Sequence, residues 1–229
     1  MYNDDLLIKY MVESFDRNEP ILSQKDFGPF ITISRDHGCQ ANSLAKLLTD
    51  ELAKRGFHWS ILNKEIIMEA ARKLDMEPQK VARISDSVDR TQMDQVLAAL
   101  TTKYYKSDRV IRQTIAKVVT SAAHHGNSII IGRGGAAITH GIQPSINIKL
   151  FAPLEWRVQS LMLRYHASRE HIVKDINTID YKRHRMLATS LKRNDNVTDL
   201  YDIQINCSTV NQKEMVAIII AYMVEKFRL

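Results

Sequence analysis

The sequence predicts an α/β protein in which short strands alternate with helices around a mainly parallel sheet. Apolar runs indicate the three central strands, at residues 30–33, 128–131 and 146–151. Segments with apolar residues at helical spacing lie between and after these runs. Because ligands of parallel sheets bind at the carboxyl ends of the strands, we expect one edge to be lined by the loops 34–42, 132–135 and 152–153.

The other elements follow from periodicity and punctuation. Leucines at helical spacing predict a helix over 43–53, and Pro153 suits the first turn of a helix over 154–165. The alternating run 201–206 predicts a last strand, which a closing helix over 212–227 follows. Segment 63–126 has almost no strand signal and is expected to be a helical insertion, whereas 168–193 is expected to be a strongly basic helix.

Composition limits the class of protein. The chain has 229 residues, 45% of them apolar, which is enough for one sizeable core. No stretch approaches the roughly 20 apolar residues of a membrane span, and the early acids argue against a signal peptide, so the cytoplasm is the expected location. Two cysteines, Cys39 and Cys207, are far apart in sequence, and neither a disulfide framework nor a metal site is indicated.

Charge favours an anionic partner. The net charge is +6, yet the basic residues are dispersed and mixed with acids, and the aromatic residues form no stacking pattern. We therefore expect nucleotides as ligands, no membrane partner, and nucleic acid only as a weaker alternative. Steep salt dependence of polynucleotide binding would be the mark of that alternative.

The loop between the first strand and the first core helix is the candidate phosphate site, because a helix N-terminus offers unpaired amide groups and a positive dipole end. The phosphate-loop pattern GxxxxGK[ST] does not match it: Arg35 and Gln40 stand at its glycines, Ala41 at its lysine and Asn42 at its hydroxyl. An ordinary strand-to-helix turn is the alternative. The candidate phosphate-binding residues are Ser34, Arg35, Asp36, His37, Gly38, Cys39, Gln40, Ala41, Asn42 and Ser43.

At this loop the chain resembles the cytidylate kinase-like family, whose members read ITISRExGSGGxxIA where this chain reads ITISRDHGCQANSLA at 31–45. Gln40 and Ala41 replace two of the family's glycines. Further segments resemble the family in the same order: NKEII at 63–67, IIGRG at 130–134, LFAPLEWR at 150–157, DYKR at 180–183 and DLYDIQIN at 199–206. The resemblance covers about residues 30–226, and its specificity lies in the ordered set.

The resemblance implies a P-loop kinase-type three-layer α/β/α fold with a helical insertion that binds a nucleoside monophosphate and a helical lid. One domain over 1–229 would then have its core at about 28–62, 127–163 and 191–229, the monophosphate-binding lobe at about 63–126 and the lid at about 164–190. The implied reaction transfers the γ-phosphoryl group of ATP to CMP, dCMP or a related monophosphate, with Mg²⁺ as cofactor. No metal ligands of the protein itself are predicted.

The resemblance also implies the roles of individual residues, since phosphoryl transfer depends on positioned cations. The expected catalytic residues are Arg133, Arg164, Arg183 and Arg185, and the expected acceptor-binding residues are Asn63, Arg112, Arg133 and Asp180. A second hypothesis is that Arg35 partly replaces the missing lysine, because a guanidinium can bind phosphate bidentately. As alternatives, Asn63 would merely cap a helix and Arg185 would lie on an exposed basic face.

A rival function fits the same residues. Gln40, Ala41 and the absence of an acid after Arg133 are also what a catalytically weak or inactive nucleotide-binding or sensing module would show. Turnover separates the two, because an enzyme must stabilise a transition state and a sensor need only bind. Dimerisation through the segment before residue 20 is left open.

Overall fold

The computed structural model describes residues 28–63, 108–190 and 197–229, and within them five parallel strands form one sheet in the order β2-β3-β1-β4-β5. The strands are β1 (Phe30–Arg35), β2 (Ser60–Leu62), β3 (Ser128–Ile131), β4 (Ser145–Phe151) and β5 (Ile203–Asn206). Parallel strands buried on both faces are continuously apolar. In β1 and β4 this apolar character is broken by Thr32 and Asn147, whose side chains hydrogen bond to each other at 2.6 Å.

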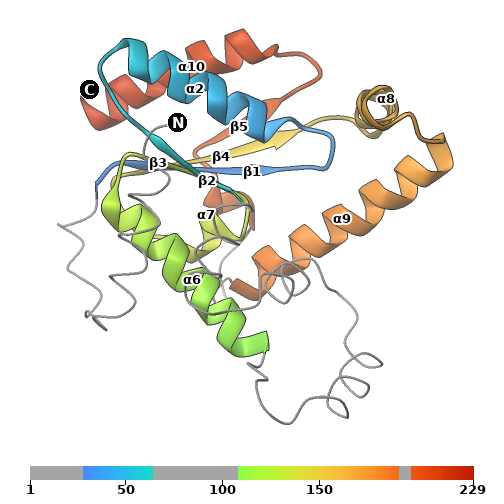
Figure 1. Ribbon diagram of the computed structural model, residues 1–229, viewed down its shortest axis with the longest axis horizontal. Coiled ribbons are helices and arrows are strands. Elements are labelled where there is room, and N and C mark those ends of the chain that lie inside the picture. The colour runs from blue at the N-terminus through green and yellow to red at the C-terminus, as the bar shows by residue number, and fades with distance from the viewer. Residues whose placement is uncertain (1–27, 64–107, 191–196) are drawn as a thin grey trace.

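Helices cover both faces of the sheet, so the described chain has three layers (Figure 1). The helices α2 and α10 pack together on one face, and α6 and α7 lie on the other. The helices α8 and α9 pack against each other beside the sheet. Their bounds are α2 (Ala41–Lys54), α6 (Asp108–His125), α7 (Gly135–Ile138), α8 (Leu154–Tyr165), α9 (Arg169–Ser190) and α10 (Gln212–Phe227), and a 3-10 turn spans Val197–Leu200.

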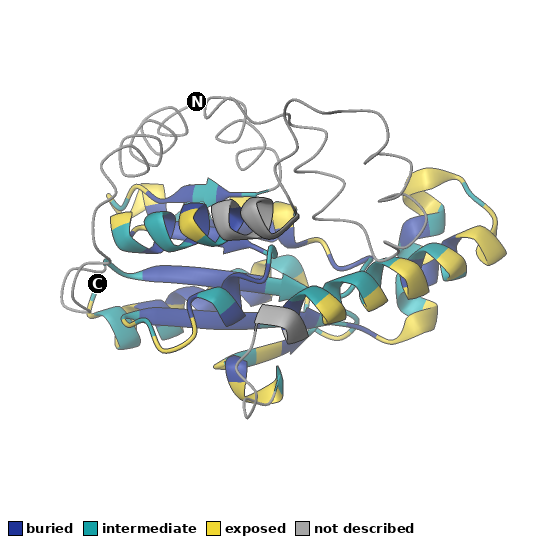
Figure 2. Ribbon diagram, turned by 90° about the horizontal axis from the view of Figure 1, so that it is seen from below, coloured by how far each residue is buried: buried dark blue, intermediate teal, exposed yellow. Residues whose placement is uncertain are grey.

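The main core lies between the sheet and the α2/α10 layer. Leu44, Leu48 and Leu52 recur at helical spacing on α2, and each is at most 1% exposed. They pack in one cluster with apolar residues of the central strands and of α10. Figure 2 shows the strands as buried and the outer helix faces as exposed. None of the described helices is both long enough and apolar enough to cross a membrane.

The predicted α/β class with its parallel sheet is confirmed, and α8 and α10 have the predicted bounds. Pro153 is the N-cap of α8 rather than a residue of its first turn. The sequence analysis missed β2 and α7, because elements of three and four residues are too short to show a period. Most of the insertion predicted for 63–126 lies outside the described residues, and α6 forms its end.

The register brings the carboxyl ends of the central strands together. Ile33 of β1 is paired with Ile131 of β3 and with Ile148 of β4. The chain leaves β1 toward the β2 edge and leaves β4 toward the β5 edge, so the connections diverge between β1 and β4. In parallel α/β sheets such a divergence opens a crevice that binds ligands.

Candidate functional site

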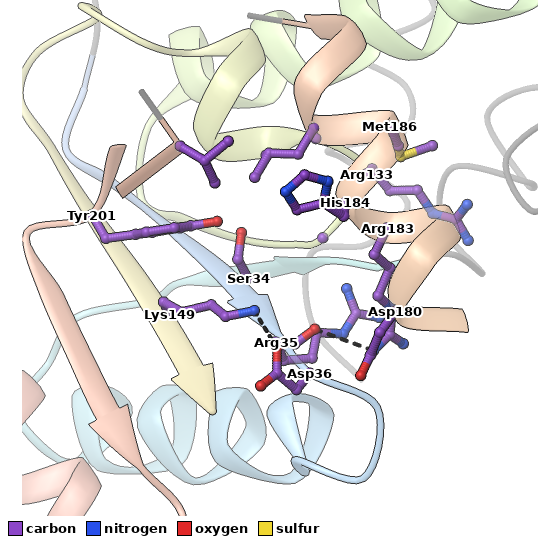
Figure 3. A pocket seen from close by; sticks show the side chains of 14 residues that line it. Ser34, Arg35, Asp36, Arg133, Lys149, Asp180, Arg183, His184, Met186 and Tyr201 are labelled. Carbon is purple, nitrogen blue, oxygen red and sulfur yellow. Dashed lines mark hydrogen bonds and ion pairs between the residues drawn. The ribbon is translucent and has the colours of Figure 1, made fainter. Parts of the chain in front are cut away.

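Two adjoining pockets lie at this edge of the sheet and share the residues Arg35 and Arg183. The loop pocket, of about 370 Å³, is bounded by residues 37–43 and by Leu161, Arg164 and Tyr165 of α8. The strand pocket, of about 230 Å³, is bounded by the ends of β1, β3 and β4 and by α9 (Figure 3). One arginine pair therefore lies between two compartments, the arrangement that transfer between two bound molecules requires.

The loop pocket contains the N-terminus of α2. Gln40 is the N-cap but makes no side-chain capping bond, and the first turn of α2 contains no acidic residue. The first amides of a helix have no partner within the helix, and the helix dipole adds a partial positive charge there. This end of α2 can therefore accept an anionic group without help from a lysine.

A carboxylate from α9 is attached to the loop. Asp180 accepts a hydrogen bond from the His37 amide at 2.7 Å and one from Arg157 Nη1 at 2.5 Å. Arg157 also donates to the carbonyl oxygens of His37 and Ala152, at 3.2 and 3.0 Å. The predicted lid residue Asp180 thus holds a loop amide in the structure, and an incoming phosphate would compete with it for that amide.

Gly38 makes room for this arrangement. Its φ of 103° is in the region that favours glycine, and a Cβ placed on it would lie 3.0 Å from the Cβ of Arg157. The loop and α8 approach each other closely because residue 38 has no side chain.

Arg133 is placed in the strand pocket by an unusual backbone. It has a φ of 58°, between Gly132 and Gly134 at 68° and 70°. A left-handed conformation costs a non-glycine residue roughly 1 kcal/mol, and such strain is concentrated at functional sites. Gly132 has a further role, because a Cβ there would lie 1.7 Å from Nη1 of Arg35. The guanidinium of Arg35 therefore lies over the space that Gly132 leaves empty.

Lys149 of β4 brings a cation to Asp36, where the loop between β1 and α2 begins. Its Nζ lies 2.5 Å from Oδ1 of Asp36, and both side chains are about one-quarter exposed in the strand pocket (Figure 3). Arg183 donates to the carbonyl oxygen of Arg35 at 3.2 Å, which brings a cation of α9 to the same edge. The site thus gathers positive side chains from β1, β3, β4 and α9.

His37 gives the loop a pH dependence. Burial, followed by the nearby Arg183, lowers the pKa of His37 below its usual 6.5. Neutral His37 therefore favours the fold above pH 6.5, and that contribution is lost as the pH falls through the lowered pKa. We expect the melting temperature of His37→Asn to fall less than that of the wild type between pH 7 and pH 5. The control His58→Asn changes an exposed histidine, and its melting temperature should fall with pH as that of the wild type does. Parallel curves for wild type and His37→Asn would contradict this expectation.

Most of the predicted site residues line the two pockets. Residues 34–43 do so, as do Arg133, Arg164, Asp180 and Arg183. Arg185 does not: it is exposed, and its guanidinium lies over the Tyr181 ring at 6.0 Å. Asn63 follows β2 and lines neither pocket. The side chain of Arg112 lies outside the described residues, so its predicted acceptor contact stays a prediction.

The sequence analysis missed two cations of the site. Lys149 is the one charged residue of β4, and that charge in a central strand was the signal that could have revealed it. Arg157 follows the proline of α8 by four residues and is only 12% exposed, but no pattern in its surroundings predicts its contact with Asp180.

The two cysteines are brought together although 168 positions separate them in sequence. The side chains of Cys39 and Cys207, which follows β5, interact with each other, and Cys207 packs against the core cluster that contains Cys39. Sequence distance alone concealed this pair, because the parallel sheet places the end of β5 beside the loop that follows β1.

Phosphoryl transfer depends on Mg²⁺, so the residues that line the two pockets must be compared with the ligands that this ion requires. The described residues contain no cluster of three or more His, Cys, Asp or Glu that could hold a metal ion. Mg²⁺ in kinase sites needs none, because it is bound through one or two carboxylates, water and the substrate phosphates. Asp36, at the rim of the phosphate loop, is a carboxylate of the required kind, so the site fits a phosphate-bound Mg²⁺.

Comparison with known proteins shows which family the chain belongs to. The model of the cytidylate kinase-like family matches residues 30–209, which include both pockets. The chain belongs to the cytidylate kinase-like family. Membership gives it a nucleotide kinase-like fold and makes nucleotides and Mg²⁺ the ligands that its family implies.

One solved structure shares the fold of this chain. The crystal structure of an uncharacterized protein from Eubacterium ventriosum ATCC 27560 is similar, with a TM-score of 0.59 and 17% identity over 86% of this chain and 98% of that one. TT1252 from Thermus thermophilus is 15% identical over the same shares of the two chains, with a TM-score of 0.41. No curated protein matches the chain.

Proposed function

We propose that this cytidylate kinase-like protein is a nucleoside monophosphate kinase that transfers the γ-phosphoryl group of ATP to CMP, dCMP or a related monophosphate. The observation that carries the proposal is the pair of adjoining pockets with Arg35 and Arg183 between them. A donor bound in the loop pocket and an acceptor bound in the strand pocket would have their phosphates on either side of these two cations.

In this proposal the phosphates of ATP bind the N-terminus of α2 and its preceding loop. Asp36 would hold Mg²⁺ together with the donor phosphates, and the ion would supply neutralisation of their charge. Lys149 of β4 lines the strand pocket and supplies a cation on the acceptor side of Arg35 and Arg183, where it partly offsets the lysine that the loop lacks at Ala41. Arg183 stabilises charge on the moving phosphoryl group, because a guanidinium can bind two phosphate oxygens at once.

The acceptor would bind in the strand pocket. Arg133 contacts its phosphate from the end of β3, and Tyr201 and Ser34 line the side of the pocket nearer to β4 and β1 (Figure 3). Division of the chain into a core, a monophosphate-binding lobe and a lid formed by α9 belongs to the same proposal. Closure of α9 would exclude water, which strengthens each contact between the arginines and the phosphates.

The second candidate is a nucleotide-binding module with weak or no catalysis. It is favoured by one specific observation, the Asp180 carboxylate that already holds the His37 amide of the loop. A sensor in which a phosphate displaces that carboxylate would respond to nucleotide by moving α9 and would need no turnover.

A coupled ADP-release assay with ATP, Mg²⁺ and a panel of nucleoside monophosphates, beside thermal-shift binding of the same ligands, tests both candidates. Turnover on CMP, dCMP or UMP supports the kinase. Stabilisation by nucleotide without turnover supports the sensor, and no response in either assay overturns both proposals.

Arg133→Asn links turnover to the strand pocket. Asparagine tolerates a positive φ, so this variant removes the guanidinium while keeping the backbone. We expect the KM for the monophosphate to rise about tenfold, the loss of one charge-assisted contact of about 1.4 kcal/mol. The matched control is Arg55→Asn, a change at the exposed C-cap of α2 far from both pockets, which should leave KM unchanged. Equal KM values for the two variants would remove Arg133 from the acceptor site.

A further inference from the structure

The thiol pair formed by Cys39 and Cys207 lies where the phosphate loop meets the β5–α10 connection. Cys39 is the residue before the N-cap of α2, is 8% exposed and lines the loop pocket. Cys207 comes directly after β5, and its amide donates to the Phe151 carbonyl oxygen at 2.8 Å. Both are free cysteines, and the chain contains no others.

The surroundings of the pair hold the two segments against each other. Gln212, the first residue of α10, accepts a hydrogen bond from the Ser43 hydroxyl at 2.9 Å and donates to the Gln40 side chain at 3.5 Å. The two cysteines thus lie near the contact between two segments. One segment is the loop with the first turn of α2, and the other is the start of α10. These contacts hold the backbone of the loop against the segment that contains Cys207, on the side where the two thiols interact.

The two thiols are not equivalent. The hydrogen bond from Cys39 lowers the pKa of Cys207, whereas the same bond and then burial raise the pKa of Cys39. Cys207 is also the more exposed of the two. Because an oxidant must reach the attacking thiol, the more exposed Cys207 is the residue that attacks and the buried Cys39 is the residue that resolves, which agrees with the directions of the two pKa shifts.

We propose that Cys39 and Cys207 form a redox modification site, which a low-molecular-weight disulfide such as oxidised glutathione converts into an intramolecular disulfide. The Cys207 thiolate attacks one sulfur of glutathione disulfide, the S–S bond breaks, and one glutathione thiolate leaves. Cys39 then attacks Cys207 Sγ in the mixed disulfide and displaces the second glutathione. The two cysteines lose two electrons and two protons, and the glutathione disulfide gains them as two thiols.

The raised pKa of Cys39 hinders the second step less than it would in the reduced pair. Once Cys207 carries glutathione, it has no negative charge, and its hydrogen bond no longer holds the proton on Cys39. The raised pKa of Cys39 is therefore partly relieved at the moment when its thiolate is needed.

Closing the disulfide would alter the phosphate loop. An S–S bond is about 2.05 Å long, much shorter than a hydrogen bond between sulfurs, so Cys39 must move toward β5. This moves the residue before the α2 N-cap away from the ligand position in the loop pocket. The expected loss of triphosphate binding rests on the proposed function, but formation of the disulfide does not.

The test treats the full chain with oxidised glutathione, followed by intact mass measurement, non-reducing gels and peptide mapping. We expect a monomer lighter by two hydrogens and a crosslinked peptide pair containing both cysteines, reversed by dithiothreitol. Cys39→Ser should stop at the mixed disulfide on Cys207. Cys207→Ser should show much slower glutathione addition, because only the buried thiol remains.

Three results would overturn the site: a mixed disulfide on Cys207 that persists in the wild type, dimers linked between chains, or thiols that stay reduced under these conditions. Binding of MgATP is then measured on the oxidised and reduced protein. A drop of about tenfold on oxidation, absent in Cys207→Ser over the same treatment time because its buried thiol stays reduced, supports the displaced loop. Crosslinking without any nucleotide binding in either form would leave the thiol site standing and count against the proposed function alone.

Discussion

Lys149→Met is expected to lower kcat/KM for the proposed phosphoryl transfer by about 100-fold, the loss that follows when one positioned charge is removed from a site that stabilises developing negative charge. The methionine has a similar length and keeps the packing of β4, but it leaves nothing positive on the β4 side of the loop. The Asp36 carboxylate is about one-quarter exposed and can be solvated by water, so stability should fall by less than about 1 kcal/mol. Steady-state kinetics and melting curves on the same preparation separate the two effects.

Two matched variants decide whether the Lys149 charge is what matters. Lys149→Arg keeps a cation at the end of β4 and should recover most of the activity. Lys46→Met removes a lysine from the exposed face of α2 and should have no effect. A kcat/KM for Lys149→Met within a factor of two of the wild type would show that the loop works without a replacement lysine, or that Arg35 alone supplies it.

Gly132→Ala is expected to reproduce the loss caused by Arg35→Ala, a fall of about tenfold or more in affinity for ATP measured by titration calorimetry. The new Cβ would lie 1.7 Å from Nη1 of Arg35, so the guanidinium must leave its position. If both variants act by displacing one cation, the double variant binds ATP no more weakly than either single variant, because their effects are not independent.

Gly141→Ala is the control for backbone strain. Gly141 also has a positive φ, 82°, but a Cβ there meets no atom within 4 Å. Its cost is limited to the roughly 1 kcal/mol of the left-handed conformation, and ATP affinity should not change. Additive losses in the Gly132→Ala, Arg35→Ala double variant would mean that Arg35 has no role at the position over Gly132.

The sequence predicted those features that depend on local chemistry. Apolar runs and helical periods are properties of neighbouring residues, so the central strands, α8, α10 and the fold class follow from them. The common edge at which the strands end also follows, because parallel strands separated by helices have their carboxyl ends on the same side of the sheet. That reasoning predicted that the loop 34–42 and Arg133 lie at the same edge, as the structure shows.

Contacts between distant segments required the tertiary structure. In the sequence, nothing links Lys149 to Asp36. The β1–β4 register brings the two residues together. The same register and the return of β5 bring Cys207 to Cys39. Which charges pair and which thiols meet is decided by the lateral order of the strands, and that order is set by how helices pack on the sheet rather than by any local pattern. The sequence by itself thus determined the kind of site, and the packing of the strands decided which residues complete it.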